Sequence, residues 1–259
     1  MDYLFRIIMI FYIAILGIFL YFFGQNPPEL DKTDNPQRGL IIIFLLFVGQ
    51  FLFFVLGIWV FSPFFQDLGI DYFYISILIS TFFFVIIPFL ILTSKTHDNF
   101  SLKEIGFSMY HLNKNQRYVI LIAFVSYFIY GILRILFLEP PEEPYWWLII
   151  LLMLYSNAFI EEFFGRAFIQ LKLETIYGVN RALIFQTIFF VLIHIPSNIY
   201  RYLQYPDSGS LIIFFLFQAI HGFVYGLLYW KTRSIYPSII VHYLTNWMGP
   251  IYFLFVNNF

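Results

Sequence analysis

Long apolar runs, separated by short polar connections, dominate the pattern of the chain. Eight of the runs are about twenty residues long, which is the length that a helix needs to cross the hydrocarbon core of a bilayer. They lie at 4–24, 40–61, 72–93, 118–138, 146–171, 181–197, 210–230 and 236–257. Backbone groups in lipid must be satisfied within a segment, and no ten-residue alternation typical of barrel strands is visible. The pattern therefore predicts an all-α polytopic membrane bundle of about eight transmembrane helices.

Composition supports this fold class and narrows the partners. Of the 259 residues, 61% are hydrophobic and only 11% are charged, whereas about a quarter of the residues in soluble proteins are charged. The formal net charge of −1 gives no reason to expect a nucleic-acid partner. The chain has no cysteine, which excludes disulfides, thiolate nucleophiles and cysteine-ligated zinc. We expect membrane lipid and a membrane-bound substrate as partners, and the oligomeric state stays open.

The connections between the runs give no sign of a domain boundary. The linker 25–39 is polar and turn-rich, and the stretch 139–144 is acidic and rich in proline. The segment Ser101–Phe107 within the longest connection is typical of a short amphipathic helix at the membrane interface. We therefore expect one integral membrane domain over 1–259, with N-terminal spans in 1–145 and the spans that carry the polar motifs in 146–257.

Lysine and arginine fall mostly on one side of the predicted bundle. That side carries Lys32, Arg38, Lys95, Lys103, Lys114, Arg117, Lys172, Arg181, Lys231 and Arg233. The other side carries Arg6, Arg201 and, near a helix end, Arg134. By the positive-inside rule the first side is cytoplasmic and both termini are outside. Glu161 would lie roughly 16 Å from the cytoplasmic end at 1.5 Å per residue, so we expect a water-filled cavity open to the cytoplasm.

Three charged side chains, Glu161, Glu162 and Arg166, interrupt the fifth apolar run. Ionisable groups inside a membrane helix are costly and mark functional sites. In an α-helix Glu162 and Arg166 share a face and can neutralise each other, whereas Glu161 is turned by roughly 100° from its neighbour. We interpret Glu162 as the partner of Arg166 and Glu161 as the carboxylate left for chemistry. The alternative is a buried ion-pair cluster that only locks helix packing.

The sixth and eighth runs carry polar residues at intervals of four. Gln186, Phe190 and His194 fall on one helix face, and so do His242 and Asn246. His194 is a candidate base, because neutral imidazole is tolerated in an apolar site; the alternative is a packing histidine. His242 and Asn246 offer two donors for a developing oxyanion, or else an interhelical hydrogen bond worth about 0.6–2 kcal/mol.

The seventh run adds Gln218, His221, Gly222 and Gly226. We interpret the two glycines as sites where helices pack closely, because small residues let helix backbones approach each other in membranes. His221 is at most a supporting group, and no catalytic role is assigned to it.

These residue types limit the chemistry. The zinc-protease motif His-Glu-x-x-His and the Gly-x-Ser-x-Gly elbow are both absent from the sequence. A carboxylate and an imidazole that activate water, opposite two oxyanion donors, are what amide hydrolysis needs. Two other classes stay open: a non-catalytic membrane scaffold or bacteriocin-immunity protein, and a proton-coupled transporter with Glu161 as its carrier. No sequence repeat supports the transporter.

Three motifs in this order, Glu161-Glu162-x-x-x-Arg166, Phe190-x-x-x-His194 and His242-x-x-x-Asn246, resemble those of the CAAX protease and bacteriocin-processing family. This family includes the type II CAAX prenyl endopeptidases. The resemblance covers roughly residues 157–246. Earlier residues are similar only as spans that precede the motifs.

The resemblance implies an intramembrane endopeptidase of eight helices whose cavity opens to the cytosol. Eukaryotic relatives remove the last three residues of isoprenylated CAAX proteins, so a lipidated or membrane-bound peptide is the implied substrate. By the same resemblance Glu161 and His194 activate water, His242 and Asn246 stabilise the oxyanion, and Glu162 with Arg166 supports the helix. A metal-free site is the preferred expectation. Zinc is the alternative cofactor, with Glu161, His194 and His242 as its ligands.

Overall fold

The computed structural model describes residues 2–23, 26–27, 30, 35–67, 72–94, 99–107, 113–137, 154–204 and 211–257. All secondary structure in these ranges is helical, which confirms the all-α bundle. Among the described helices, four are long and apolar enough to cross a membrane: Pro36–Phe65, Ile75–Thr93, Val179–Gln204 and Leu211–Thr232. Ile7–Phe22 is a shorter apolar helix. The chain is therefore an integral membrane protein.

The N-terminal half forms four long helical segments. These are α1 (Asp2–Phe22); α2 (Pro36–Leu56), which continues through the π-helical η1 (Gly57–Phe61) into α3 (Ser62–Asp67); α4 (Tyr72–Thr81), which continues through η2 (Phe82–Ile86) into α5 (Ile87–Thr93); and α7 (Lys114–Phe137). The start of α2 is set locally, because Pro36 occupies the first turn and the Asn35 side chain accepts a hydrogen bond from the Arg38 N–H at 3.0 Å.

The C-terminal half carries the polar motifs. Its elements are η3 (Leu154–Phe159), α9 (Ile160–Glu162), η4 (Phe163–Gln170), α10 (Leu171–Tyr177), α11 (Val179–Ile193), α12 (Ile195–Gln204), α13 (Leu211–Thr232) and α14 (Tyr236–Asn257). Each predicted span overlaps one of the long helical segments. The first part of the predicted span 146–171, the acidic stretch 139–144 and the proposed division at 145 lie outside the described residues.

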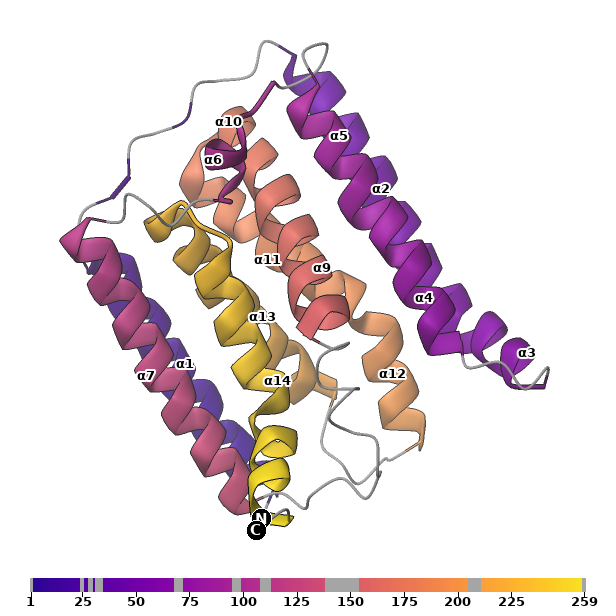
Figure 1. The fold of residues 1–259 in the computed structure, drawn as a ribbon, viewed down its shortest axis with the longest axis vertical. Helices are drawn as coiled ribbons and strands as arrows, with labels where there is room; N and C mark the ends of the chain where they lie inside the picture. The colour runs from indigo at the N-terminus through magenta and orange to yellow at the C-terminus, as the bar shows by residue number, and fades with distance from the viewer. Residues whose placement is uncertain are drawn as a thin grey trace.

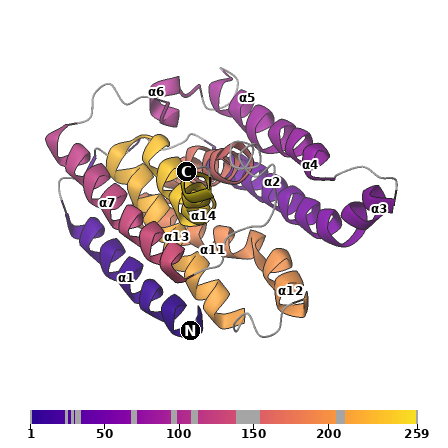
Figure 2. The ribbon, with the colours of Figure 1, turned by 60° about the horizontal axis from the view of Figure 1, so that its bottom comes forward.

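The helices form a layered bundle in which the motif helices lie in the middle. Helices α1 and α7 cover one flank of α13 and α14, while α2, α4 and α5 stand on the opposite flank (Figures 1 and 2). The segment from η3 to α10 and helix α11 lie between these flanks. Both ends of the chain are at the same end of the bundle, as the sequence predicted (Figure 1). Large apolar side chains such as Phe11, Phe44 and Leu78 are exposed on the outer helices, as lipid-facing residues would be.

Two glycines of α13 let the motif helices come close, as interpreted from the sequence. A Cβ atom on Gly222 would lie 2.9 Å from the Phe190 ring, and one on Gly226 would collide with the Gln186 amide. The backbone carbonyls of these glycines accept side-chain hydrogen bonds, at 3.1 Å from Gln186 to Gly222 and at 2.9 Å from Gln170 to Gly226. Helix α13 is therefore a fixed wall against which η4 and α11 are held.

The expected short helix in the connection after α5 is present as α6 (Leu102–Ile105). Ser101 and Glu104 form a reciprocal capping box, with the Ser101 N–H donating to the Glu104 carboxylate at 2.7 Å. Hydrogen bonds from Ser101 hold the pKa of the Glu104 carboxyl below its usual range. Gly106 ends the helix in a left-handed conformation, and its carbonyl accepts a hydrogen bond from the Ile235 N–H. This contact fixes α6 to the beginning of α14.

Candidate active site

The helix that carries the two glutamates is not a regular α-helix. Glu161 and Glu162 occupy the three-residue α9, between the π-helical segments η3 and η4. The sequence predicts α-helical geometry along the whole span, and the structure corrects this prediction. The backbone bonds of a π-helix run from i to i+5, and such segments are frequent at functional sites. The wider turns change where side chains point along this span, yet Glu161 and Glu162 still face different surroundings.

Glu162 is the centre of a buried charged network. Its Oε2 lies 3.2 Å from Arg166 Nε, and neither side chain has any exposed surface. Its Oε1 lies 2.8 Å from His242 Nδ1, so the carboxylate accepts a hydrogen bond from the α14 histidine. The pairing of Glu162 with Arg166 is therefore as the i,i+4 spacing predicted. The bond to His242 is a contact that the spacing within one helix could not show.

Arg166 is also held on its other sides. One guanidinium nitrogen donates to the Gly222 carbonyl at 3.3 Å, and the guanidinium carbon lies 4.7 Å from the centre of the Phe190 ring and 5.5 Å from that of Tyr225. A cation over aromatic faces gains electrostatic attraction that is larger where water is excluded. The arginine thus ties η4 to α11 and α13 as well as neutralising Glu162.

Glu161 faces two histidines across the interior. Its Oε2 lies 3.5 Å from His194 Nε2 and 3.9 Å from His242 Nε2. Both distances exceed those of a normal hydrogen bond, and this oxygen is buried without a hydrogen-bond partner among the described residues. Buried polar atoms are nearly always bonded, so an exception marks a place where a further group belongs.

The other ring nitrogens fix how the two histidines present themselves. His194 Nδ1 lies 2.7 Å from the Phe190 carbonyl oxygen, which can only accept, so this nitrogen carries a proton. His242 Nδ1 faces the ion-paired Glu162 carboxylate and is protonated for the same reason. Both imidazoles therefore direct Nε2 toward Glu161. In the neutral form Nε2 is a proton acceptor, and only the imidazolium form donates from it.

His194 stands at a break between two helices rather than within one. Helix α11 ends at Ile193, and α12 begins at Ile195 with Pro196 in its first turn. Because Pro196 has no N–H, it cannot continue the backbone ladder of α11. The ring of Phe190 packs against the imidazole of His194 with 4.5 Å between ring centres. His194 therefore lies inside the apolar span Val179–Gln204, as predicted, but at a turn between α11 and α12.

The remaining predicted residues lie on α13 and α14. Asn246 follows His242 by one turn on α14 and is partly buried. His221 is buried on α13 with its Nδ1 2.7 Å from the Phe217 carbonyl, which is its packing role. The residue that the sequence reasoning missed is Tyr225, whose ring stacks on His242 with 4.8 Å between centres. In the sequence Tyr225 is marked only by its position four residues after His221. Aromatic residues are common in membrane helices, so this spacing did not single it out.

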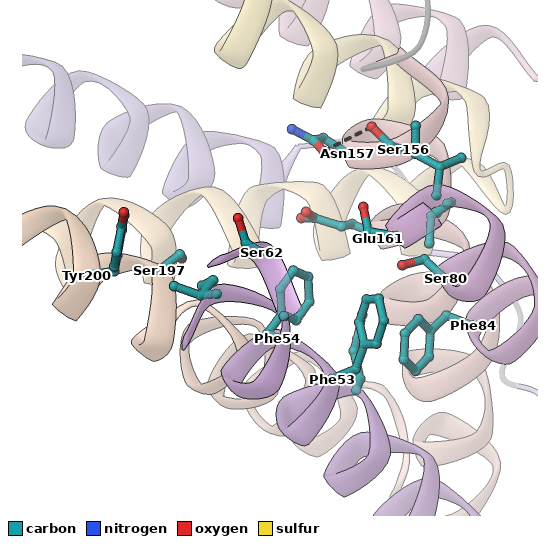
Figure 3. Close-up of a pocket in the computed structure, with 16 residues that line it drawn as sticks. Phe53, Phe54, Ser62, Ser80, Phe84, Ser156, Asn157, Glu161, Ser197 and Tyr200 are labelled. Atoms are coloured by element: carbon teal, nitrogen blue, oxygen red, sulfur yellow. Dashed lines mark hydrogen bonds between the residues drawn. The ribbon is translucent and has the colours of Figure 1, made fainter. Parts of the chain in front are cut away.

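A pocket of about 430 Å³ opens beside Glu161. Figure 3 shows the Glu161 carboxylate pointing into it, with the rings of Phe53, Phe54 and Phe84 on one wall. The other lining residues include hydroxyl and amide side chains: Gln50, Ser62, Ser76, Ser80, Ser156, Asn157, Ser197 and Tyr200. Among the lining residues Glu161 is the one that can carry a charge. The pocket therefore offers apolar surface and neutral hydrogen-bonding groups next to a buried carboxylate.

The motif helix lines this pocket with residues that precede Glu161. These are Ser156, Asn157 and Ile160. On the side toward Lys172 a second pocket, bounded by Arg166 and others, holds about 10 Å³, which is room for about one water molecule.

The fold and the site define a polytopic helical membrane protein with glutamates and histidines gathered inside the bundle. Residues 143–248 match the family model described as Type II CAAX prenyl endopeptidase Rce1-like. The matched segment covers 106 of the 259 residues and includes the three motifs, so it agrees with the resemblance that these motifs carry. Neither a curated protein nor a solved structure matches the chain.

Proposed function

We propose that the chain is an intramembrane endopeptidase in which Glu161 and His194 activate a water molecule. The observation that carries this proposal is Glu161 Oε2, which is buried without a hydrogen-bond partner among the described residues and faces two imidazole nitrogens. A carboxylate in this position accepts the proton of a water held between it and His194, which makes the water a nucleophile. The pocket beside Glu161 supplies the space for the peptide.

Each step of the reaction has a group to serve it. The water oxygen attacks the peptide carbonyl carbon and its proton passes to Glu161, while the carbonyl oxygen becomes an oxyanion. His242 and Asn246 donate hydrogen bonds to that oxyanion. The peptide C–N bond then breaks, and the proton held by Glu161 is transferred to the leaving amine. Glu162 and Arg166 keep the helix and His242 in place.

The contact of His242 with Glu162 refines its role. Because His242 Nδ1 donates to Glu162, a donor at Nε2 exists only in the imidazolium form. A cationic donor gives a stronger, charge-assisted hydrogen bond to an oxyanion than a neutral one. We therefore propose that His242 acts as an imidazolium.

The substrate that we propose is a lipidated or membrane-bound peptide, with a prenylated CAAX-type C-terminus as the first candidate. Ligand pockets usually enclose about 300–1,000 Å³, and the volume of about 430 Å³ fits a short peptide segment with an apolar side chain or part of a lipid. The phenyl rings suit the apolar part, and the hydroxyl and amide side chains suit peptide backbone groups.

The test is cleavage by the protein reconstituted in liposomes. A farnesylated CAAX peptide and the same peptide without lipid are incubated with wild-type protein and with Glu161→Gln, and the products are weighed by mass spectrometry. Loss of three residues from the farnesylated peptide alone supports the CAAX-type substrate. Cleavage of both peptides supports a broader peptidase. If wild-type protein and Glu161→Gln give identical spectra for every membrane peptide offered, the proposal fails and a scaffold, immunity or transport function takes its place.

We propose a metal-free site, with zinc as the alternative. The atoms Glu161 Oε2, His194 Nε2 and His242 Nε2 are ligand types that zinc accepts. Among the described residues, however, no group of three His, Asp or Glu side chains has the arrangement of a metal site. We expect activity to survive exhaustive dialysis against a strong chelator. Loss of activity that added zinc specifically restores would establish the metalloprotease mechanism instead.

We also propose that the basic end of the bundle faces the cytoplasm and both termini lie outside, on the positive-inside rule. The resemblance to the family implies a cavity open to the cytosol. We therefore also propose that the active-site cavity faces the cytoplasm.

A further inference from the structure

Gln50 is a polar residue on the buried face of α2. The buried positions of this helix are Gly39, Ile43, Phe47 and Gln50, which follow one another by three or four residues and so lie on one face. Gln50 is 1% exposed, and its Oε1 atom has no hydrogen-bond partner among the described residues. Burying an amide costs free energy unless its polar atoms are bonded. The position therefore calls for a further group that bonds this amide.

Aromatic contacts on both sides fix this part of α2. Phe47, one turn before Gln50, stacks on Phe189 of α11 with 4.6 Å between ring centres. Phe53, one turn after Gln50, meets the Phe84 ring of η2 edge-on at 5.9 Å. Residues three apart on a helix are neighbours on its surface, so both contacts hold the face that carries Gln50. The amide is therefore held at a fixed depth inside the bundle.

Gln50 and Glu161 share the walls of two pockets. Among the described residues, both line the pocket of about 430 Å³ and also the small pocket of about 10 Å³. They are the residues that the two described linings have in common. The amide and the carboxylate thus stand at the boundary between the space proposed for the peptide and a much smaller one. A molecule in the small pocket would lie beside Glu161 without displacing the peptide.

The small pocket is polar and has the size of one water molecule. Besides Gln50 and Glu161, its described lining includes the polar residues Arg166 and Gln186. Each of the four has a buried atom without a hydrogen-bond partner among the described residues: Gln50 Oε1, Glu161 Oε2, Arg166 Nη1 and Gln186 Oε1. A buried water needs about 10–15 Å³ of such space and two to four polar partners. The small pocket meets both requirements.

The surroundings of these atoms decide which of them donate and which accept. Gln186 Nε2 donates to the Gly222 carbonyl at 3.1 Å and to the Thr187 hydroxyl at 2.9 Å, which leaves Oε1 as an acceptor. Arg166 Nη1 can only donate. A cation here would face the charge of Arg166, and an anion would face that of Glu161. A neutral water, which both donates and accepts, is the ligand that fits.

We infer that the small pocket binds one water molecule, and that through this water Gln50 is a positioning residue for Glu161. The water accepts a hydrogen bond from Arg166 Nη1 and donates to Gln50 Oε1 and to the Glu161 carboxylate. Gln186 Oε1 can share one of the donated bonds.

This inference rests on the proposed function, because it specifies how the carboxylate of the same site is aimed. The bound water holds Glu161 from the side of the small pocket, while the carboxylate faces the larger pocket and His194. The water that attacks the peptide is a different molecule, because it lies between Glu161 and His194, and His194 is not in the described lining of the small pocket.

A crystal structure of the full chain grown in a lipid phase, at a resolution that shows ordered waters, tests the site directly. Wild-type protein is compared with Gln50→Met and Leu52→Met. Methionine keeps the length of glutamine and removes both hydrogen-bonding groups. Leu52 is half exposed on the same helix and is the matched control. We expect one ordered water between Gln50 and Arg166 in the wild type and in Leu52→Met, and its loss in Gln50→Met.

Turnover of a cleaved peptide gives the second measurement. We expect Gln50→Met to lower kcat about tenfold, which is the effect of losing one hydrogen bond to a charged group. KM should not change, because Gln50 acts on Glu161 and not on the bound peptide. A residue that only shapes the peptide pocket would change KM instead. Leu52→Met should match the wild type in both constants.

A wild-type structure without a water in the small pocket overturns the inference, and it does so even where Gln50→Met fails to fold. A water that stays in place in Gln50→Met, or an unchanged kcat in that variant, overturns the role of Gln50. The two proposals fail separately. A water that is lost in Gln50→Met, in a protein that cleaves no membrane peptide, defeats the protease proposal and leaves the water site standing. Cleavage that depends on Glu161 in a protein without this water does the opposite.

Discussion

Two adjacent carboxylates, Glu161 and Glu162, have opposite surroundings. Glu162 has no exposed surface and is bonded to Arg166 and His242. Glu161 keeps 13% of its side chain exposed and faces the pocket and the Nε2 atom of His194 at 3.5 Å. The same chemical group is thus held by an ion pair and a short hydrogen bond at one position, and faces a pocket and a more distant imidazole at the next. The difference suits Glu162 to a structural role and Glu161 to a reactive one.

The largest expected effect is the loss of turnover on substitution of Glu161, which faces the pocket. We expect Glu161→Gln to lower turnover by about 10²–10⁴-fold, which is the usual contribution of a general base. Thermal stability in detergent should stay near that of the wild type, because glutamine keeps the shape and leaves no charge unpaired. Turnover of a cleaved peptide and a thermal unfolding curve measure the two quantities. Near wild-type turnover in Glu161→Gln would remove Glu161 from the mechanism, and His194→Ala should show a comparable loss.

Substitutions of Glu162 or Arg166 should lower the free energy of unfolding. Arg166→Ala and Glu162→Ala each leave a charge in a buried site, which typically costs about 3–5 kcal/mol. The double substitution leaves no such charge and should recover much of the loss, although His242 then lacks its acceptor. We expect a coupling energy well above the roughly 0.5 kcal/mol scatter of independent sites. Chemical unfolding measures these free energies. If the loss in the double variant equals the sum of the losses in the two single variants, the interaction between Glu162 and Arg166 contributes nothing to stability.

A smaller effect on stability is expected at Gly222, where α13 packs closely against α11. Gly222→Ala places a Cβ atom 2.9 Å from the Phe190 ring, and such overpacking typically costs about 1–3 kcal/mol. The shift of Phe190 should also disturb His194, which packs on it at 4.5 Å. Gly165→Ala is the matched control, because a Cβ there meets nothing within 4 Å. Equal unfolding temperatures and turnover for the two variants would contradict the close packing assigned to Gly222.

Much of the fold followed from the sequence because apolar length alone identifies helices in a membrane. The division between Glu161 and Glu162 also followed, since residues four apart on a helix are neighbours. What could not be predicted depends on contacts between distant segments. The bond of His242 to Glu162 spans 80 positions, and the pocket walls from Phe53 and Phe84 come from helices that carry no motif.

The remaining differences are local distortions of the backbone. The π-helical segments on both sides of Glu161 leave no mark in an apolar run, because any side chain tolerates a wider turn there. The break at His194 was signalled by Pro196, which removes a backbone donor from the helix ladder. A prediction of spans from apolar length alone detects neither the π-helical segments nor the break at His194.

The one-turn distance between Glu162 and Arg166 also has a consequence for biosynthesis. The motif helix is made before α14, so Glu162 must enter the bilayer while its partner His242 does not yet exist. A charged residue at the centre of an inserting helix costs about 2.5–3.5 kcal/mol, and a pair within one helix neutralises itself from the moment it forms. We expect Arg166→Ala to reduce membrane insertion of this helix more in chains cut after Gly178 than in the full chain, as a glycosylation reporter would measure. If Arg166→Ala reduced insertion equally in the truncated and the full chain, the later helices would contribute nothing to keeping the motif helix in the membrane. We expect the ion pair to keep the helix in the membrane during the interval before the rest of the site is made.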